Sequence, residues 1–375
     1  MKHEIVPLKE TFAFADTNLS TNQVTSLYKV GDTKLFNLNN NATGEYYQDY
    51  ATLAYIGNHA EVWVHNEAIT STQAAQLATE FDQSIYSLVT ENFGIPSDID
   101  DKRRIAILCF DIQDNSARED VDNYITGYFG AADLYKNEQL DVPISNEMEI
   151  VYIDTYPTMG NNRNNLDVTK SYSTLVHEFQ HLVTAVQERF TENKHNATMA
   201  KWLDEGVSLA AEQMYLKGPL TDYIQYFNES STIRDGRSLL EWTHTDPLAN
   251  YSLSYLFLQH LKIQANQGNA IFKEIILHEG TEVEAVESII HKYIDSTMSF
   301  GEFMTAFRIA LVLKADTGLY GFGGNKDFDA VTTQVYNSSA PNLKAGGAVI
   351  IQTNGRAVEP SSSKGHDITF TGVYK

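Results

Sequence analysis

The stretch Leu175–Val183, LVHEFQHLV, decides how the rest of the chain is interpreted. Around it, apolar side chains recur with the spacing of one buried α-helical face. The members of this apolar stripe are Leu175, Phe179, Leu182 and Val186. The stripe predicts a buried helix and accounts for its packing without His177, Glu178 or His181.

His177 and His181 are four residues apart, so a helix places both imidazoles on one face. Both can reach one zinc ion at a Zn–N distance of about 2.0–2.1 Å. Glu178 lies about 100° around the helix from His177, where it flanks the ion and can take a proton from water. The alternative is coincidence, with roughly 0.02 chance occurrences of HExxH in a chain of this composition. A catalytic zinc site also needs a third protein ligand.

A third ligand is expected within Lys201–Ala211, KWLDEGVSLAA, which predicts a second helix. A loop could return this helix nearly antiparallel to the first, and both Asp204 and Glu205 are then candidate ligands. Spacing alone does not separate them. The alternative is an exposed acidic pair in the first turns of a helix, where the helix dipole favours carboxylates.

The order HEFQH and then WLDEG resembles the gluzincin metallopeptidases. The runs NHAEVWVHN, FDQSIYSLVTENFG, ILCFDIQDN and SNEMEIVYID resemble, in this order, the hyicolysin family of neutral zinc metallopeptidases. The resemblance extends over about residues 51–261. It implies an α+β, thermolysin-like metallopeptidase domain with a mixed-sheet lobe and a helical lobe, and it implies an exported bacterial enzyme, secreted or held at the cell surface.

Matched residue by residue, the resemblance implies that His177, His181 and Glu205 are zinc ligands and that Glu178 is the general base. Asp204 then takes a variable position. The expected activity is zinc-dependent cleavage of internal peptide bonds in a protein or peptide substrate. Two other functions stay open: a binding or adhesion protein that keeps the zinc scaffold without turnover, and an aminopeptidase-type zinc hydrolase.

A second hydrogen-bond donor usually stabilises the oxyanion of such a reaction. The segment DPLANYSLSYLFLQHL resembles the tyrosine-bearing helix that gluzincins place across the cleft, and Tyr251 is the first choice within it. Tyr255 on the same helical face and His244 in WTHTDP are alternatives. Because the chain has 21 tyrosines, ordinary packing of both tyrosines is an equally good interpretation.

The run TGYFGAADLY precedes the predicted strand MEIVYIDT and is a candidate sheet edge for binding an extended peptide. Its small residues Gly130, Ala131 and Ala132 would leave room for a substrate. An inner hairpin is the alternative.

Changes of pattern along the 375 residues predict three parts: a β-rich unit over 1–70, the metallopeptidase domain over 71–314, and a β-rich unit over 315–375. Apolar residues at helical spacing predict one helix over 71–93. Apolar runs predict strands within 104–112 and 148–155.

The formal net charge of -22 argues against nucleic-acid partners, and no apolar run is long enough to insert into a membrane. The first residues, MKHEIVPLKETFAF, lack the apolar core of a signal peptide. The single cysteine, Cys109, is expected to be a buried apolar residue. The sequence does not indicate an oligomeric state.

Asp98, Asp100 and Asp101 alternate like the ligands of a calcium loop, but they lack the glycine and the distal glutamate of an EF-hand. A solvated turn is therefore the favoured interpretation over a calcium site.

Overall fold

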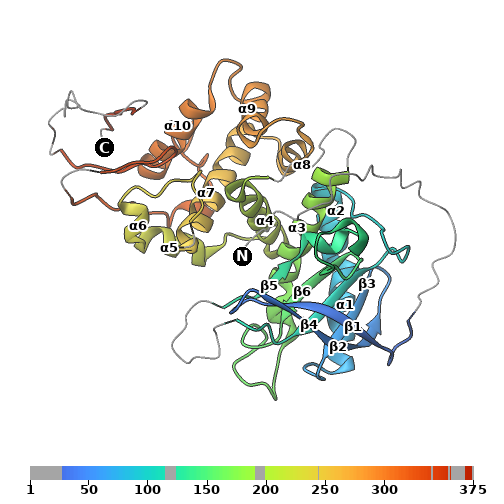
Figure 1. Ribbon diagram of the computed structural model, residues 1–375. Coiled ribbons are helices and arrows are strands. Elements are labelled where there is room, and N and C mark those ends of the chain that lie inside the picture. The colour runs from blue at the N-terminus through green and yellow to red at the C-terminus, as the bar shows by residue number, and fades with distance from the viewer. Residues whose placement is uncertain are drawn as a thin grey trace. The chain divides into compact units, whose positions relative to one another are not determined.

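The computed structural model describes residues 28–114, 124–190, 199–243, 245–338, 341–353, 355 and 368–373 (Figure 1). The chain forms two compact units, Met1–Thr198 and Met199–Lys375. His244 and residues 1–27 of the first predicted part lie outside the described residues. Within the described residues, no helix is long and apolar enough to cross a membrane.

The first unit is built on a six-stranded mixed sheet with the strand order β1-β2-β3-β4-β6-β5. The strands are β1 (Thr33–Asn40), β2 (Glu45–Ile56), β3 (Ala60–His65), β4 (Ile105–Phe110), β5 (Gly127–Phe129) and β6 (Ile150–Asp154). The pairs β3/β4 and β4/β6 are parallel, and the other three neighbouring pairs are antiparallel. The short strand β5 therefore forms one edge, as predicted for TGYFGAADLY, although the strand ends at Phe129 and Ala131 begins a 3₁₀ turn.

Burial explains the different sequence patterns of these strands. The central strands β4 and β6 are buried along their whole length, so both of their faces are apolar. By contrast, β1 and β2 alternate between buried and exposed residues, because only one of their faces is covered. The strands within 33–65 thus belong to the same sheet as those within 105–154. The division into parts at residues 70 and 314 stays a prediction.

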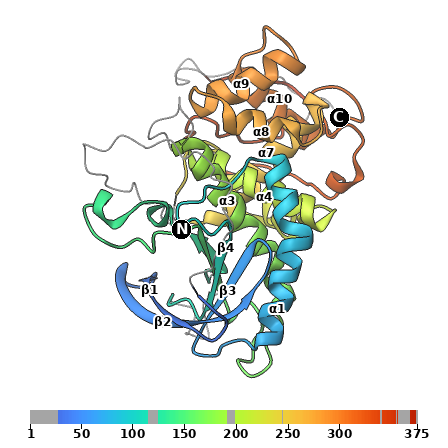
Figure 2. The same cartoon turned by 90° about the vertical axis from the view of Figure 1, so that its right-hand side faces the viewer.

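The predicted helix over 71–93 is confirmed, with a π-helical turn inside it. Its parts are α1 (Ser71–Glu80), the π turn (Phe81–Ile85) and α2 (Tyr86–Asn92). The remaining long helix of this unit is α3 (Tyr172–Phe190), which carries HEFQH. Helix α1 packs against β2 and β3 (Figure 2). Helix α3 packs against β5 and β6. The ring of Phe81 contacts the ring of Phe179 with centroids 4.9 Å apart, so the stripe of α3 is buried under the first helix.

A buried polar network fixes the hairpin of β5 and β6. The Tyr152 hydroxyl in β6 donates to Asp133 Oδ2 at 2.8 Å, and Asn146 Nδ2 donates to the Tyr152 hydroxyl at 2.7 Å. The backbone N–H of Asn146 donates to Asp133 Oδ1 at 2.6 Å. Because Asp133 lies in the 3₁₀ turn that comes after β5, these bonds hold that turn to β6.

The second unit is helical. Its helices are α4 (Lys201–Leu216), α5 (Thr221–Glu229), α6 (Ser231–Arg234), α7 (Pro247–Ala265), α8 (Ala270–Leu277), α9 (Glu282–Tyr293) and α10 (Phe300–Leu313). Helix α7 is buried along most of its length and packs against α4, α5 and α9. It is thus the central element of the unit.

The C-terminal segment crosses the surface of the helical unit. His260 Nε2 on α7 donates to the carbonyl of Leu319 at 2.9 Å, and Gln264 Nε2 donates to the carbonyl of Gly321 at 2.8 Å. No strand is assigned in the described residues after Leu313. The β-rich C-terminal unit therefore stays a prediction.

A buried carboxyl at the start of β6 gives the fold a pH dependence. Glu149 accepts hydrogen bonds from Ser97 Oγ at 2.6 Å and from the Ile99 backbone N–H at 2.9 Å. Burial raises its pKa to about 7, against an ordinary value near 4.5. Between these two pH values the folded protein keeps a proton that the unfolded chain has released.

We expect Glu149→Gln to become progressively more stable than the wild type as the pH rises from 4.5 to 7. In this window the wild-type free energy of unfolding falls by about 1.4 kcal/mol per pH unit through this group, because the unfolded state binds fewer protons. Glutamine keeps an acceptor oxygen and does not titrate. Urea unfolding of both proteins at pH 5 and pH 7 measures the difference, and a difference that does not change with pH would contradict the assignment.

Candidate active site

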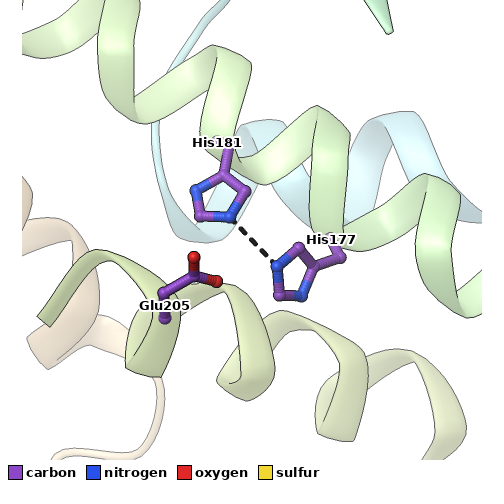
Figure 3. A group of neighbouring side chains, drawn as sticks. All are labelled: His177, His181 and Glu205. Atoms are coloured by element: carbon purple, nitrogen blue, oxygen red, sulfur yellow. Dashed lines mark hydrogen bonds between the residues drawn. The ribbon is translucent and has the colours of Figure 1, made fainter. Parts of the chain in front are cut away.

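The two histidines of HEFQH lie one turn apart on the buried face of α3. His177 is 6% exposed and His181 is 2% exposed. Their Nε2 atoms lie 3.0 Å apart, and the ring planes make an angle of 74° (Figure 3). Both Nε2 atoms therefore point to one small region beside the helix.

Glu205 completes this group from α4. The structure brings His177, His181 and Glu205 together so that one ligand atom of each lies within 4.8 Å of the others (Figure 3). Glu205 is fully buried, and the neighbouring Asp204 is not part of the group. Of the two acidic residues that spacing leaves open, only Glu205 lies in this group, and its role as a ligand stays a prediction.

The donor set fits zinc. Two imidazole nitrogens and one carboxylate are a known catalytic zinc ligand set, which leaves one coordination position open. Two nitrogens bound to one tetrahedral zinc lie about 3.3 Å apart. The observed separation of 3.0 Å between the Nε2 atoms of His177 and His181 is close to that value. Within the part of the chain that the structure describes, no other group of three or more His, Cys, Asp or Glu side chains could hold a metal ion.

The glycine of WLDEG has a packing role. A Cβ atom at Gly206 would lie 3.1 Å from Leu258 Cγ and 3.2 Å from the carbonyl oxygen of Ser254, both on α7. These contacts are tighter than nearly all real Cβ contacts, so a larger residue would require α4 and α7 to move apart by a few tenths of an ångström. The residue next to Glu205 therefore sets the position of the helix that carries the carboxylate.

A second glycine lies beside Glu178. Glu178 is buried on α3. A Cβ atom at Gly127 of β5 would lie 3.2 Å from Glu178 Cγ, 2.7 Å from Thr174 Cγ2 and 2.8 Å from the carbonyl oxygen of Tyr152. The absence of a side chain at this position lets the edge strand lie directly against α3, next to the candidate base.

The two candidate tyrosines of α7 differ in their surroundings. Tyr255 is fully buried; its hydroxyl donates to Gln213 Oε1 at 2.7 Å and accepts from the Leu220 N–H at 3.0 Å. Burial raises the pKa of this hydroxyl. Tyr251 is partly exposed. The hydroxyl of Tyr255 already forms two internal hydrogen bonds, so Tyr251 is the better candidate for contact with a substrate.

Two residues near Tyr251, Trp242 and Lys201, were not among the site residues predicted from the sequence. The ring of Trp242 meets the ring of Tyr251 edge to face, with centroids 5.0 Å apart. Lys201 Nζ lies 5.7 Å from the centre of the Trp242 ring and interacts electrostatically with Glu205. The spacing of four between Lys201 and Glu205 in KWLDEG could have indicated the lysine. No local pattern indicates Trp242.

The loop after Ser97 does not gather its carboxylates around a common point. Asp98 Oδ1 accepts the N–H of Arg103 at 2.7 Å, and Asp100 forms an ion pair with Lys102 at 2.7 Å. These protein donors take the positions that a cation would need. Within the described residues the loop therefore gives no support to a calcium site.

Cys109 is buried in β4, as expected. Burial raises the pKa of its thiol to about 12, so the thiolate that a nucleophile requires is absent near neutral pH. The cysteine is a packing residue of the sheet.

Comparison with known proteins identifies a relative over most of the chain, although no protein-family profile matches it. The neutral metalloprotease ShpI of Staphylococcus hyicus is 44% identical over 326 residues, which cover 87% of this chain and 73% of that protein. The six-stranded mixed sheet and the helical unit agree with the thermolysin-like fold expected for such an enzyme. The protein is therefore a metalloprotease, a hydrolase that acts on protein or peptide substrates, and the chain belongs to the hyicolysin family of neutral zinc metallopeptidases.

Proposed function

We propose that the protein is a zinc-dependent endopeptidase in which His177, His181 and Glu205 hold the ion and Glu178 is the general base. The observation that carries the proposal is the convergence of the three ligand atoms within 4.8 Å, with Glu178 adjacent in sequence to His177. A binding protein without turnover would need this convergence but would not need the carboxylate of Glu178.

The chain's own residues would divide the reaction as follows. When bound, zinc supplies Lewis-acid chemistry, which acidifies water and polarises the carbonyl of the peptide bond to be cleaved. Glu178 accepts the proton of the attacking water and passes it to the leaving amine. The Tyr251 hydroxyl donates a hydrogen bond to the oxyanion that develops on the carbonyl oxygen.

The edge strand β5 is the proposed support for the substrate. An extended peptide that pairs with Gly127–Phe129 would form main-chain hydrogen bonds regardless of its sequence. Because Gly127 lies next to Glu178 Cγ, such a peptide passes close to the base. This arrangement favours cleavage within a chain over removal of a terminal residue.

Export from the cell is part of the proposal. The acidic composition and the single cysteine support it, since a high negative charge favours solubility and a lone thiol forms no internal disulfide. Detection of the protein in washed cells alone, with none in the culture medium or on the cell surface, would contradict it.

We expect the double variant His177→Ala, His181→Ala to lose zinc, because one carboxylate cannot hold the ion alone. The wild type should bind about one zinc per chain. Metal analysis after dialysis checks both values, and Asp98→Asn with Asp100→Asn is a matched control that should keep the metal. Full zinc retention by the histidine variant would disprove the ligand assignment.

Glu178→Gln should keep the metal and lose activity by a factor of about a hundred to ten thousand, which is the usual contribution of a general base. The amide is similar in size to the carboxylate and cannot accept the proton. Casein hydrolysis and zinc content, measured on the same preparation, separate the two effects. If the variant cleaves casein at the wild-type rate, another group must be the base.

Tyr251→Phe should lower kcat on the order of a hundredfold and leave KM nearly unchanged, because the lost hydrogen bond forms in the transition state. Tyr255→Phe is the matched control. It removes the bonds to Gln213 and Leu220, so it should lower the melting temperature and have a smaller effect on kcat. The opposite ranking of the two kcat values would move the role to Tyr255.

The products of a mixed peptide pool distinguish the two kinds of peptidase. An endopeptidase releases internal fragments with new amino termini, whereas an aminopeptidase releases single residues from the amino terminus. Mass spectrometry of the digest reads this difference directly. Release of single residues alone would replace the proposed activity with the aminopeptidase alternative.

A further inference from the structure

The ring of Tyr251 contacts two aromatic rings. It stacks on Tyr223 of α5, with centroids 6.0 Å apart and an angle of 29° between the planes. The ring of Trp242 meets it edge to face, with centroids 5.0 Å apart and an angle of 80° between the planes. Aromatic contacts of this kind stabilise a ring beyond its burial and so favour one side-chain rotamer over the others.

The segment that carries Trp242 is fixed on both sides of the tryptophan. Asn250 Nδ2, one residue before Tyr251 on α7, donates to the carbonyl of Glu241 at 3.1 Å. On the other side, the Arg237 guanidinium donates to Thr243 Oγ1 and to the carbonyl of Thr245. The indole is therefore anchored by its neighbours and does not depend on Tyr251 for its own position.

Asp246 fixes the beginning of α7. It adopts a left-handed backbone conformation with φ of 61°, and its carboxylate accepts the N–H of Ala249 at 3.3 Å. The same carboxylate accepts hydrogen bonds from Tyr226 and Thr232. The backbone under Tyr251 is thus rigid, and the remaining freedom of Tyr251 is in its side-chain torsions.

Lys201 supports the indole from α4. Its ammonium lies 5.7 Å from the centre of the Trp242 ring, within the range of a cation–π contact. Burial lowers the pKa of Lys201, and the negative charges of Glu205 and Asp204 counteract that effect. Through Lys201 and Trp242, the helix that carries the carboxylate of Glu205 is connected to the ring of Tyr251.

We infer that Trp242, supported by Lys201, is a positioning residue that holds the Tyr251 hydroxyl in its reactive orientation. The inference rests on the proposed role of Tyr251. Without the indole, the phenol ring loses its edge-to-face contact, and the hydroxyl samples positions away from the oxyanion. A misplacement of about 1 Å can cost on the order of a hundredfold in rate.

A double-mutant cycle between Trp242→Leu and Tyr251→Phe tests the inference. In the wild-type background Trp242→Leu should lower kcat about tenfold or more and change KM by less than about twofold. In the Tyr251→Phe background the same substitution should change kcat by less than about twofold, because the hydroxyl that it positions is already absent. A purely structural role would give the same loss in both backgrounds and would overturn the inference.

The outcomes separate this inference from the proposed function. If Tyr251→Phe lowers kcat and Trp242→Leu does not, the positioning role fails and the role of Tyr251 stands. If Tyr251→Phe has the wild-type kcat, the proposed role of Tyr251 fails, and the positioning role fails with it. Zinc content and melting temperature are measured for every variant. If Trp242→Leu does not fold, Trp242→Phe takes its place in the cycle, and the same test of non-additivity applies.

Lysine variants provide a second test at saturating zinc. Lys201→Arg keeps the cation and should keep at least half of the wild-type kcat, whereas Lys201→Met should lower kcat about threefold or more. Lys262→Met is the matched control. Lys262 is a partly buried lysine of α7 whose pKa is also lowered by burial, and its replacement should leave kcat unchanged. An equal loss in Lys201→Met and Lys262→Met would contradict a specific role for Lys201.

Discussion

Burial of ionisable side chains at one point is the constraint on which the rest of the structure depends. His177, His181 and Glu205 are almost completely removed from solvent, and burying a carboxylate costs several kcal/mol unless positive charge or hydrogen bonds compensate. A divalent cation held by these side chains would provide that compensation. The apolar stripe of α3 and the close contact of α4 with α7 then have the same effect. The first places the two histidines, and the second places Glu205, in the buried interior, where packing alone would favour apolar side chains.

Two glycines make this placement sterically possible. Gly206 lets α4 lie against Ser254 and Leu258, and Gly127 lets the edge strand lie against Thr174 and Glu178. Neither glycine has a positive φ, so conformational freedom is not the reason for it. Each matters because it lets two elements lie close together: a side chain at Gly127 would collide with its neighbours, and one at Gly206 would be tightly packed. The metal-binding group and the candidate base are thus positioned by residues that have no functional atoms of their own.

Periodicity and spacing predicted the parts of the molecule that repeat locally. The stripe of α3, the helix over 71–93 and the buried strands β4 and β6 all follow from apolar spacing. Spacing did not separate Asp204 from Glu205, because both lie in the same turn; only the fold places Glu205, and not Asp204, in the group with the two histidines.

The contact of Trp242 with Tyr251 could not be predicted from the sequence either. The tryptophan lies in a segment without regular structure, and hydrogen bonds from Arg237 and Asn250 to its neighbours fix the position of that segment. The C-terminal segment is a similar case. Side chains of α7 bind its backbone carbonyls, and such long-range pairs have no signature in the local sequence.

The brevity of β5 has a consequence for what the enzyme can accept. An exposed sheet edge is a template for any extended chain, including another copy of the same protein. Here the edge strand is three residues long and a 3₁₀ turn begins at Ala131, so it offers only a few main-chain partners. A chain that pairs with it must already be drawn out over those few residues. Compact globular proteins rarely expose such an extended segment, whereas loops, tails and unfolding intermediates do. The local unfolding of a substrate would therefore limit its cleavage more than the identity of its side chains.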